Sequence, residues 1–293
     1  MEIHRIHYFL EVARQKHFSR AAERCHVSQP SLSQQIKKLE DELGESLFLR
    51  SRDGITLTDF GKQFLPHADA IWREVTAARE FSAEYQGKVA GLIKIGAIPT
   101  IAPYLLPKLI EQVKAAHPLI QFEIFEETTQ HLVELLREGA LDFALLSPPT
   151  AIDEEADHLE LPQDELLLTL PQEHRLAQDK AVRLKDLSSD SMVQLKDAHC
   201  LSRQSQSICH TGGLTPKITI QSSQLETALG MVELGLGFTF TPRMALPFHQ
   251  HRQVNYHSIS PKPVTREIRL IWLRRHRLSK TQRAFLEQIG KAP

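Results

Sequence analysis

The first 57 residues constrain the fold most, because they hold three short helical patterns in close succession. Apolar residues recur at helical spacing over residues 6–13 and again over residues 32–43. A small second pattern contains Ala21 and Ala22, and a break at His26-Val27 separates it from the third. We therefore expect a compact trio of helices at the start of the chain.

Start and stop signals bound these helices. Ser19 is the expected N-cap of the second helix and Ser28 that of the third, because a serine hydroxyl can accept from the first backbone N–H groups. Pro30 is tolerated in a first helical turn, and Gly44 is expected to end the third helix. Residues 47–50 and 55–57 flank Asp53-Gly54, which predicts a two-residue hairpin.

Residues 58–85 form one long helical pattern. Two apolar lines repeat in it every seven residues: Phe64, Ile71 and Ala78, and beside them Phe60, Ala68 and Val75. Such a seam suits a helix that pairs with a second copy of itself, and packing on its own domain is the alternative. Pro66 lies inside the pattern and predicts a kink.

The third helix carries small polar and basic side chains away from its apolar face, as a helix that enters the DNA major groove does. They are Gln29, Pro30, Ser31, Ser33, Gln34 and Lys37. Arg50 and Arg52, beside the hairpin, suit DNA phosphates. On pattern alone, a trio of this size could instead mediate protein contacts.

Strand and helix patterns alternate from Gly91 onward. Strands are expected at 92–98, 121–125, 142–146, 166–170, 192–194, 218–221 and 268–272, with helices at 102–116, 130–137 and 225–234. This alternation predicts two small α/β units with mainly parallel sheets. Their ligands would lie at the carboxyl ends of strands and between lobes.

Composition excludes several classes of protein. The chain has 293 residues, 41% of them apolar and 24% charged, and no apolar stretch is long enough to span a membrane. The N-terminus lacks the pattern of a secretory signal, so we expect a cytoplasmic protein. Three cysteines do not suggest a structural disulfide framework.

Two of these cysteines stand in the stretch DAHCLSRQSQSICHTGG, residues 197–213. Cys200 and Cys209 are nine residues apart, which in a helix is about 13 Å, too far for a disulfide without remodelling the backbone. Three interpretations stay open: a peroxide-reactive pair, two inert buried thiols, or a zinc site with His199 and His210. A cation at His199 would lower the pKa of Cys200. We interpret Cys25 as a packing residue.

The segment FSRAAERCHVSQPSLSQQIKKLEDELGESLFLRS resembles the winged helix-turn-helix of LysR-type regulators, and GALDFAL and GLGFTFTP further along resemble their effector half. The resemblance implies an α/β protein with an α-rich N-terminal part: a winged helix-turn-helix over 1–58, a linker and dimerisation helix over 59–88, and a two-lobed, periplasmic-binding-protein-like effector domain over 89–293. Lobe I would comprise 89–162 and 267–293, and lobe II 163–266. The implied partners are double-stranded DNA, RNA polymerase and further copies in a homodimer or homotetramer.

The stretches KDAHCLSRQSQSIC, GKVAGLIKIG and GAIPTIAPYLLP resemble the peroxide-sensing OxyR branch of this family. The resemblance implies that Cys200 reacts with hydrogen peroxide and then pairs with Cys209, with no metal and no cofactor. It places Thr100, Thr129, His199 and Arg266 around the peroxide. Ser207-Ile208 depart from the branch, which has a glycine and an aromatic residue there, so the disulfide itself is in question.

Plainer roles are open for the same residues. Thr100 and Thr129 could each cap the following helix, and Arg266 could pair with a surface carboxylate. Three functions follow: a peroxide-responsive regulator, a regulator of a small organic or anionic effector with inert cysteines, and a thiol peroxidase. We expect a regulator and not an enzyme.

Overall fold

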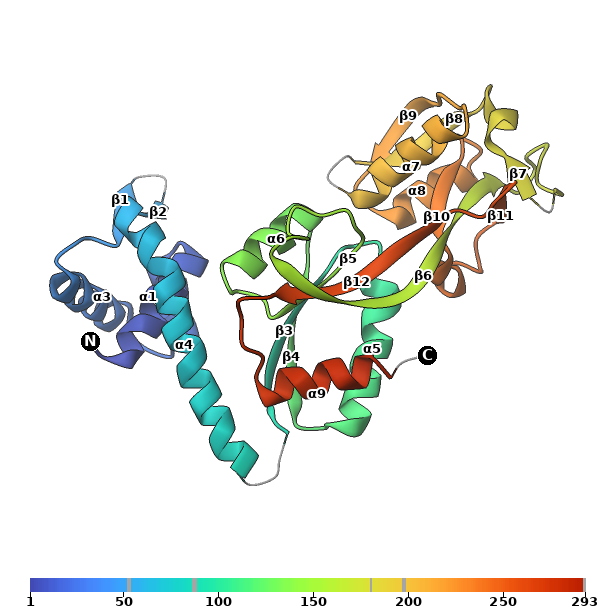
Figure 1. Cartoon of the computed structure of the whole chain (residues 1–293). Coiled ribbons are helices and arrows are strands. Elements are labelled where there is room, and N and C mark those ends of the chain that lie inside the picture. The colour runs from blue at the N-terminus through green and yellow to red at the C-terminus, as the bar shows by residue number, and fades with distance from the viewer. Residues whose placement is uncertain (52–53, 86–88, 180, 197–198, 292–293) are drawn as a thin grey trace. The chain divides into compact units, whose positions relative to one another are not determined.

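The structure is a computed structural model that describes residues 1–51, 54–85, 89–179, 181–196 and 199–291 (Figure 1). The chain divides into two compact units, residues 1–88 and 89–293. No helix in the described ranges is long and apolar enough to cross a membrane.

The N-terminal unit has the predicted trio of helices, a hairpin and a long helix. Its elements are α1 (Ile3–Gln15), α2 (Phe18–Arg24), α3 (Gln29–Leu43), β1 (Phe48–Ser51), β2 (Gly54–Leu57) and α4 (Asp59–Tyr85). Their apolar faces meet in one core, in which Phe9, Leu32 and Leu39 are fully buried. The helical spacing of the sequence is therefore the face that each helix buries.

Two local predictions in this unit need correction. The N-cap of α2 is His17 and not Ser19: the imidazole of His17 accepts from the backbone N–H of Ser19, at 3.2 Å. In the hairpin, Gly54 pairs with Ser51, so Gly54 belongs to β2 and not to the turn. The turn position Asp53 lies outside the described residues.

The boundaries of α3 follow the sequence signals. The hydroxyl of Ser28 accepts from the N–H of Ser31 at 3.4 Å, and Pro30 stands in the first turn. Gly44 ends the helix with φ of +75°, in the left-handed region that glycine enters at little cost.

The two halves of helix α4 have different surroundings. In its first half Ala68 is fully buried, and Phe60, Phe64 and Ile71 pack against the core of the same unit. Packing on its own domain is therefore correct for this half. Further along, Val75 and Ala78 line an open groove instead, and Pro66 is accommodated within the helix.

The second unit is built on one eight-stranded sheet, a separate parallel pair of strands and covering helices (Figure 1). The sheet contains β3 (Gly91–Ala97), β4 (Ile120–Glu126), β5 (Phe143–Leu146), β6 (Ala156–Pro171), β7 (Ala181–Arg183), β10 (Thr239–Pro242), β11 (Val254–Ser260) and β12 (Thr265–Leu273). The pair is β8 (Ser191–Leu195) with β9 (Lys217–Ser222), and the α-helices are α5 (Ala102–Ala116), α6 (Thr129–Arg137), α7 (Cys200–Thr211), α8 (Leu225–Glu233) and α9 (Lys280–Ile289). Two 3-10 turns complete the unit: η1 (Leu184–Leu187) and η2 (Arg243–Phe248).

The prediction of mainly parallel sheets is wrong. Strand β3 is parallel to β4 and β5, but β12 runs antiparallel to both β5 and β6, and β10 and β11 run antiparallel to β6. Alternation in the sequence reveals which segments are strands, but the direction of β12 depends on where the chain returns from the second half of the unit.

In the described residues, two large apolar cores lie along this sheet, besides a small cluster of Leu225, Leu229 and Ala245. The first gathers β3, β4, β5, α5, α6 and α9, and the second gathers β8, α7, α8 and the later part of β6. Strand β6 has 16 residues and contributes to both, although the sequence predicted only 166–170 of it. The lobe boundaries given above remain predictions.

Candidate functional site

Helix α7 holds both Cys200 and Cys209, and each lies in a different core. Cys200 is the first residue of the helix, is 5% exposed and belongs to the first core. Cys209 lies near the other end, is 1% exposed and belongs to the second core. Both are free thiols.

The geometry of an α-helix explains this division. Nine residues at 3.6 per turn are two and a half turns, so the two side chains point to opposite faces about 13 Å apart along the axis. A disulfide needs Cα atoms about 4.4–6.8 Å apart. The sulfurs of Cys200 and Cys209 therefore cannot join while α7 is intact.

Arg266, on β12, is the cation that the structure brings to the Cys200 end of α7. It is 3% exposed and donates from Nη1 to Oγ1 of Thr100 at 3.0 Å and from Nη2 to the backbone oxygen of Thr100 at 2.9 Å. Thr100 follows β3 and also hydrogen-bonds to the sulfur of Cys200. Since its oxygen accepts from Arg266, its hydroxyl proton is available to that sulfur.

The partner of Arg266 is the buried carboxylate of Asp164, on β6, and not a surface carboxylate. Nε of Arg266 lies 3.0 Å from Oδ2 of Asp164, and the other carboxylate oxygen accepts from the N–H of Met244 at 2.9 Å. Burial raises the pKa of Asp164, while Arg266 and the Met244 N–H favour its ionised form.

The ionisation of Cys200 is set by opposing effects. Burial is the largest and raises its pKa, whereas Arg266, the Thr100 hydrogen bond, Arg203 and the N–H of Leu201 each favour the thiolate. Burial also lowers the pKa of His199, so this imidazole is neutral near pH 7. The expected cation at His199 is therefore wrong, and Arg266 takes that role.

Thr129 lies at the same edge of the sheet as Thr100. They follow β4 and β3, which are parallel neighbours, so their carboxyl ends meet at one edge. Neither threonine caps a helix: Ile101 precedes α5, and Thr128 caps α6 through the N–H of His131. Oγ1 of Thr129 is buried without a hydrogen-bond partner among the described residues.

Gln204, which the sequence interpretation missed, joins α7 to this edge. Its Nε2 donates to Oγ of Ser147 at 2.8 Å, and Ser147 follows β5, the other parallel neighbour of β3. Oε1 of Gln204 is buried without a partner in the part of the chain that the structure describes. Its position four residues after Cys200, on the same helix face, was the signal that could have found it.

A metal site receives no support from the geometry. In the described residues, no three His, Cys, Asp or Glu side chains gather as they would around a metal ion. Cys200 and Cys209 lie on opposite faces of α7, which separates the four residues of the zinc interpretation.

The outer face of α3 presents the side chains expected to face DNA. Gln29, Pro30, Ser31, Gln34 and Lys37 are exposed, and Ser33 is half-buried. Oε1 of Gln29 accepts from the hydroxyl of Ser19 at 2.8 Å, which links α3 to α2. Arg50 lies in β1, and Arg52 lies outside the described residues.

Both units match known families. Residues 3–62 match the family described as bacterial regulatory helix-turn-helix protein, lysR family, and residues 86–292 match the family described as LysR substrate binding domain. The chain belongs to the LysR family of transcriptional regulators. It is a DNA-binding regulator and not an enzyme, as predicted.

Relatives of this LysR-family regulator include proteins named as peroxide regulators. It is 33% identical over 296 residues to the DNA-binding transcriptional dual regulator OxyR of Escherichia coli, covering 100% of this chain and 94% of the relative. It is 36% identical over 248 residues to a hydrogen peroxide-inducible genes activator of Haemophilus influenzae, covering 84% and 81%.

Solved structures agree with these relatives. A mutant of full-length OxyR from Pseudomonas aeruginosa matches with a TM-score of 0.81 at 30% identity, covering 99% of this chain and 93% of the other. A peroxide-bound mutant of Corynebacterium glutamicum OxyR matches with a TM-score of 0.65 at 28% identity, covering 99% and 90%. The predicted fold, with its helical N-terminal part and two-lobed effector domain, is confirmed.

Proposed function

We propose that this LysR-family regulator senses hydrogen peroxide by oxidation of Cys200, followed by a disulfide with Cys209. The observation that carries the proposal is that the Thr100 hydroxyl hydrogen-bonds to the Cys200 sulfur and also accepts from the Arg266 guanidinium. The names of the Escherichia coli and Haemophilus influenzae relatives support the same signal.

The first step converts the thiol into a sulfenic acid. Cys200 loses its proton, and the thiolate sulfur attacks one oxygen of the peroxide; the S–O bond forms as the O–O bond breaks. The departing hydroxide takes up the released proton and leaves as water. Arg266 stabilises the negative charge, first on sulfur and then on the departing oxygen.

Thr100 and Thr129 would orient the peroxide, because each hydroxyl both donates and accepts a hydrogen bond. The buried Oγ1 of Thr129, without a partner among the described residues, suits this role. His199 adjoins Cys200 and, being neutral near pH 7, contributes no charge; its ring also hydrogen-bonds to the backbone of Ser223.

The second step condenses the sulfenic acid with the Cys209 thiol. The sulfur of Cys209 attacks the sulfur of Cys200, an S–S bond forms, and the hydroxyl group leaves as water with the Cys209 proton. Because α7 holds the sulfurs on opposite faces, this step requires α7 to unwind and Cys209 to leave the second core. The unwinding would be the signal to the rest of the protein.

One observation favours a different effector. Burial raises the pKa of Cys209 to about 12, and Cys200 is also buried with a raised pKa. Inert thiols would look like this, and Thr100 and Thr129 would then bind a small organic or anionic effector between the lobes.

Peroxide treatment distinguishes the two functions. The reduced full-length protein is exposed to about one equivalent of hydrogen peroxide, quenched by thiol alkylation and analysed by mass spectrometry. We expect a peptide linking Cys200 to Cys209 in the wild type, and a sulfenic acid on Cys200 in the Cys209→Ser variant. Cys25→Ser is the matched control and leaves both products unchanged. Two free thiols and unaltered DNA binding after treatment would rule out the proposal.

We propose that α3 reads base edges while Arg50 and Arg52 contact phosphates. Changing Gln29 or Ser33 should then alter sequence preference, whereas changing Arg50 should weaken binding to all DNA about equally. Binding to a set of operator variants measures both effects. An equal loss on every sequence from a Gln29 change would count against base reading.

The partners follow from this function. We infer a cytoplasmic protein that binds double-stranded DNA and contacts RNA polymerase when it activates transcription. We also infer a homodimer, or a homotetramer of two dimers, in which a second copy covers the groove beside α4.

A further inference from the structure

The buried carboxylate of Asp164 takes no part in the chemistry proposed above, yet it holds the cation on which that chemistry depends. We propose that Asp164 is a positioning residue that sets the reactivity of Cys200: it fixes Arg266 against Thr100 and offsets the guanidinium charge, so that Cys200 rests as a thiol. The proposal deepens the proposed function, in which Cys200 is the reacting group.

Two edges of the Arg266 guanidinium serve two different partners. Nη1 and Nη2 donate to Thr100, and Nε and Nη2 face Asp164. Asp164 is itself held by the N–H of Met244, on η2. The carboxylate therefore fixes the plane of the guanidinium, and the opposite edge meets the threonine whose hydroxyl reaches the Cys200 sulfur.

Counting charges shows what Asp164 does to the thiol. Arg266, Asp164 and Cys200 are all buried, at 3%, 5% and 5% exposure. With Asp164 ionised and Cys200 protonated, the cluster is neutral, and ionising Cys200 leaves one buried net negative charge. Without the carboxylate, the thiolate would neutralise Arg266 instead. Burial penalises net charge, so loss of Asp164 should favour the thiolate.

Other charged and titratable groups around the cluster do not replace this balance. Arg203 is exposed on α7 and His199 is neutral near pH 7. Tyr104, on α5, has its pKa raised to about 12 by burial and stays neutral. Glu165, next to Asp164, pairs with exposed Arg243 at 2.5 Å. Asp164 is therefore the carboxylate in direct contact with Arg266 among the described residues.

Thiol alkylation against pH tests the proposal without using peroxide. The reduced full-length protein is treated with iodoacetamide from pH 6 to pH 10, and mass spectrometry follows the Cys200 peptide alone. For Asp164→Asn we expect the midpoint of the rate profile to fall by about one pH unit or more, with about tenfold faster alkylation at pH 7. Arg266→Gln should raise the midpoint, and the double variant should return it close to the wild-type value.

Glu165→Gln is the matched control, because it removes the neighbouring carboxylate, which pairs with Arg243 and not with Arg266. Its profile should equal that of the wild type. An Asp164→Asn midpoint equal to or above that of the control would overturn the proposal, as would a shift that persists in the double variant. If Asp164→Asn does not fold, the double variant is compared with Arg266→Gln. Equal midpoints of their two alkylation profiles would also overturn the proposal.

The readout separates this proposal from the peroxide function. A Cys200 that alkylates as expected but resists peroxide would leave the role of Asp164 standing and overturn the proposed function. An unchanged alkylation profile with normal peroxide oxidation would do the reverse.

Discussion

Cys200 and Cys209 are both buried on α7, but they have different neighbours. Burial raises the pKa of Cys200, but Arg266, the Thr100 hydroxyl and the N–H of Leu201 oppose that rise. Cys209 is buried with no such compensation, and desolvation alone raises its pKa to about 12. Cys200 is therefore the one of the two thiols whose neighbours favour ionisation, as the proposed function requires.

This contrast predicts a pH dependence of stability. The pKa of Cys209 is raised in the folded state, so between pH 9 and about 12 the unfolded chain loses a proton that the folded protein keeps. The contribution of the protonated Cys209 thiol to the free energy of unfolding is fully present below pH 9 and is lost as pH rises through this window. Between pH 9 and pH 11 the wild type should lose up to about 3 kcal/mol more than Cys209→Ser, measured by urea unfolding of the reduced proteins. Parallel losses in the two proteins would contradict the assignment.

At the scale of elements, α7 contributes side chains to both cores of the second unit. Leu201 and Ile208 are its buried aliphatic residues, and Ser202 and Ser205 are buried hydroxyl residues that hydrogen-bond to Gln194 at 2.6 Å and to the Leu201 carbonyl at 2.7 Å. After the helix, Gly213 has φ of +72°, where most other residues would be strained. Apart from the two cysteines, half of the buried side chains of α7 are serines, so its unwinding exposes less apolar surface than that of a helix with a fully apolar inner face.

If disulfide formation waits for α7 to unwind, helix propensity should control its rate. Ser207 is exposed on α7 and has no core contact to lose. Ser207→Ala and Ser207→Gly differ by about 1 kcal/mol in helix propensity, so the glycine variant should form the disulfide about fivefold faster. Quenched alkylation after peroxide follows the linked peptide over time. Equal rates in the two variants would show that unwinding does not limit the reaction.

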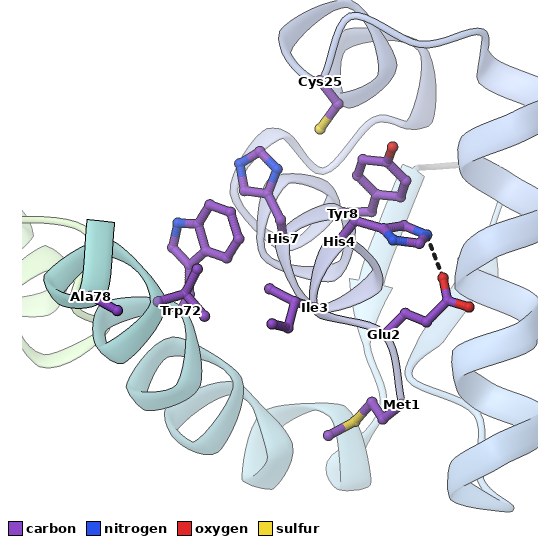
Figure 2. A pocket seen from close by; sticks show the side chains of 10 residues that line it. Met1, Glu2, Ile3, His4, His7, Tyr8, Cys25, Trp72 and Ala78 are labelled. Carbon is purple, nitrogen blue, oxygen red and sulfur yellow. Dashed lines mark ion pairs between the residues drawn. The ribbon is translucent and has the colours of Figure 1, made fainter. Parts of the chain in front are cut away.

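At the scale of the whole molecule, the N-terminal unit leaves an apolar groove uncovered. Residues of α1, α4 and the chain start line its volume of about 1140 Å³ (Figure 2). In it the ring of His7 stacks on Trp72 with centroids 4.3 Å apart, and Val75 and Ala78 continue the seven-residue seam of α4. The first part of the seam therefore packs within the N-terminal unit, and we infer that the later part packs against a second copy of the protein.

A charged side chain in the part of the α4 seam that lines the groove should weaken the association between two copies of the protein. Val75→Glu places a carboxylate in an apolar contact and should raise the dimer dissociation constant at least tenfold, because burying an unpaired charge is costly. Thr76→Glu is the matched control on the neighbouring exposed position of α4. Analytical ultracentrifugation measures both variants, and a Val75→Glu protein as dimeric as the control would place the interface elsewhere.

Helical periodicity and capping chemistry were sufficient to predict the N-terminal unit. The apolar faces of α1 and α3, the Ser28 cap and the Gly44 stop all depend on residues within a few positions of one another, and the structure confirms each. The α2 cap was wrong because a histidine, His17, accepted the hydrogen bond expected of Ser19. The family followed from motifs of the same local kind.

The sequence by itself determined the family, most of the helices and strands, and the two cysteines with their nine-residue spacing. Only the tertiary structure decided that β12 returns antiparallel, that Arg266 lies against Thr100, and that Asp164, 102 residues before it in the chain, pairs with it. The physical reason is that helix faces and caps depend on neighbours in sequence. The ionisation of a buried thiol depends instead on charges that the fold brings together from distant strands.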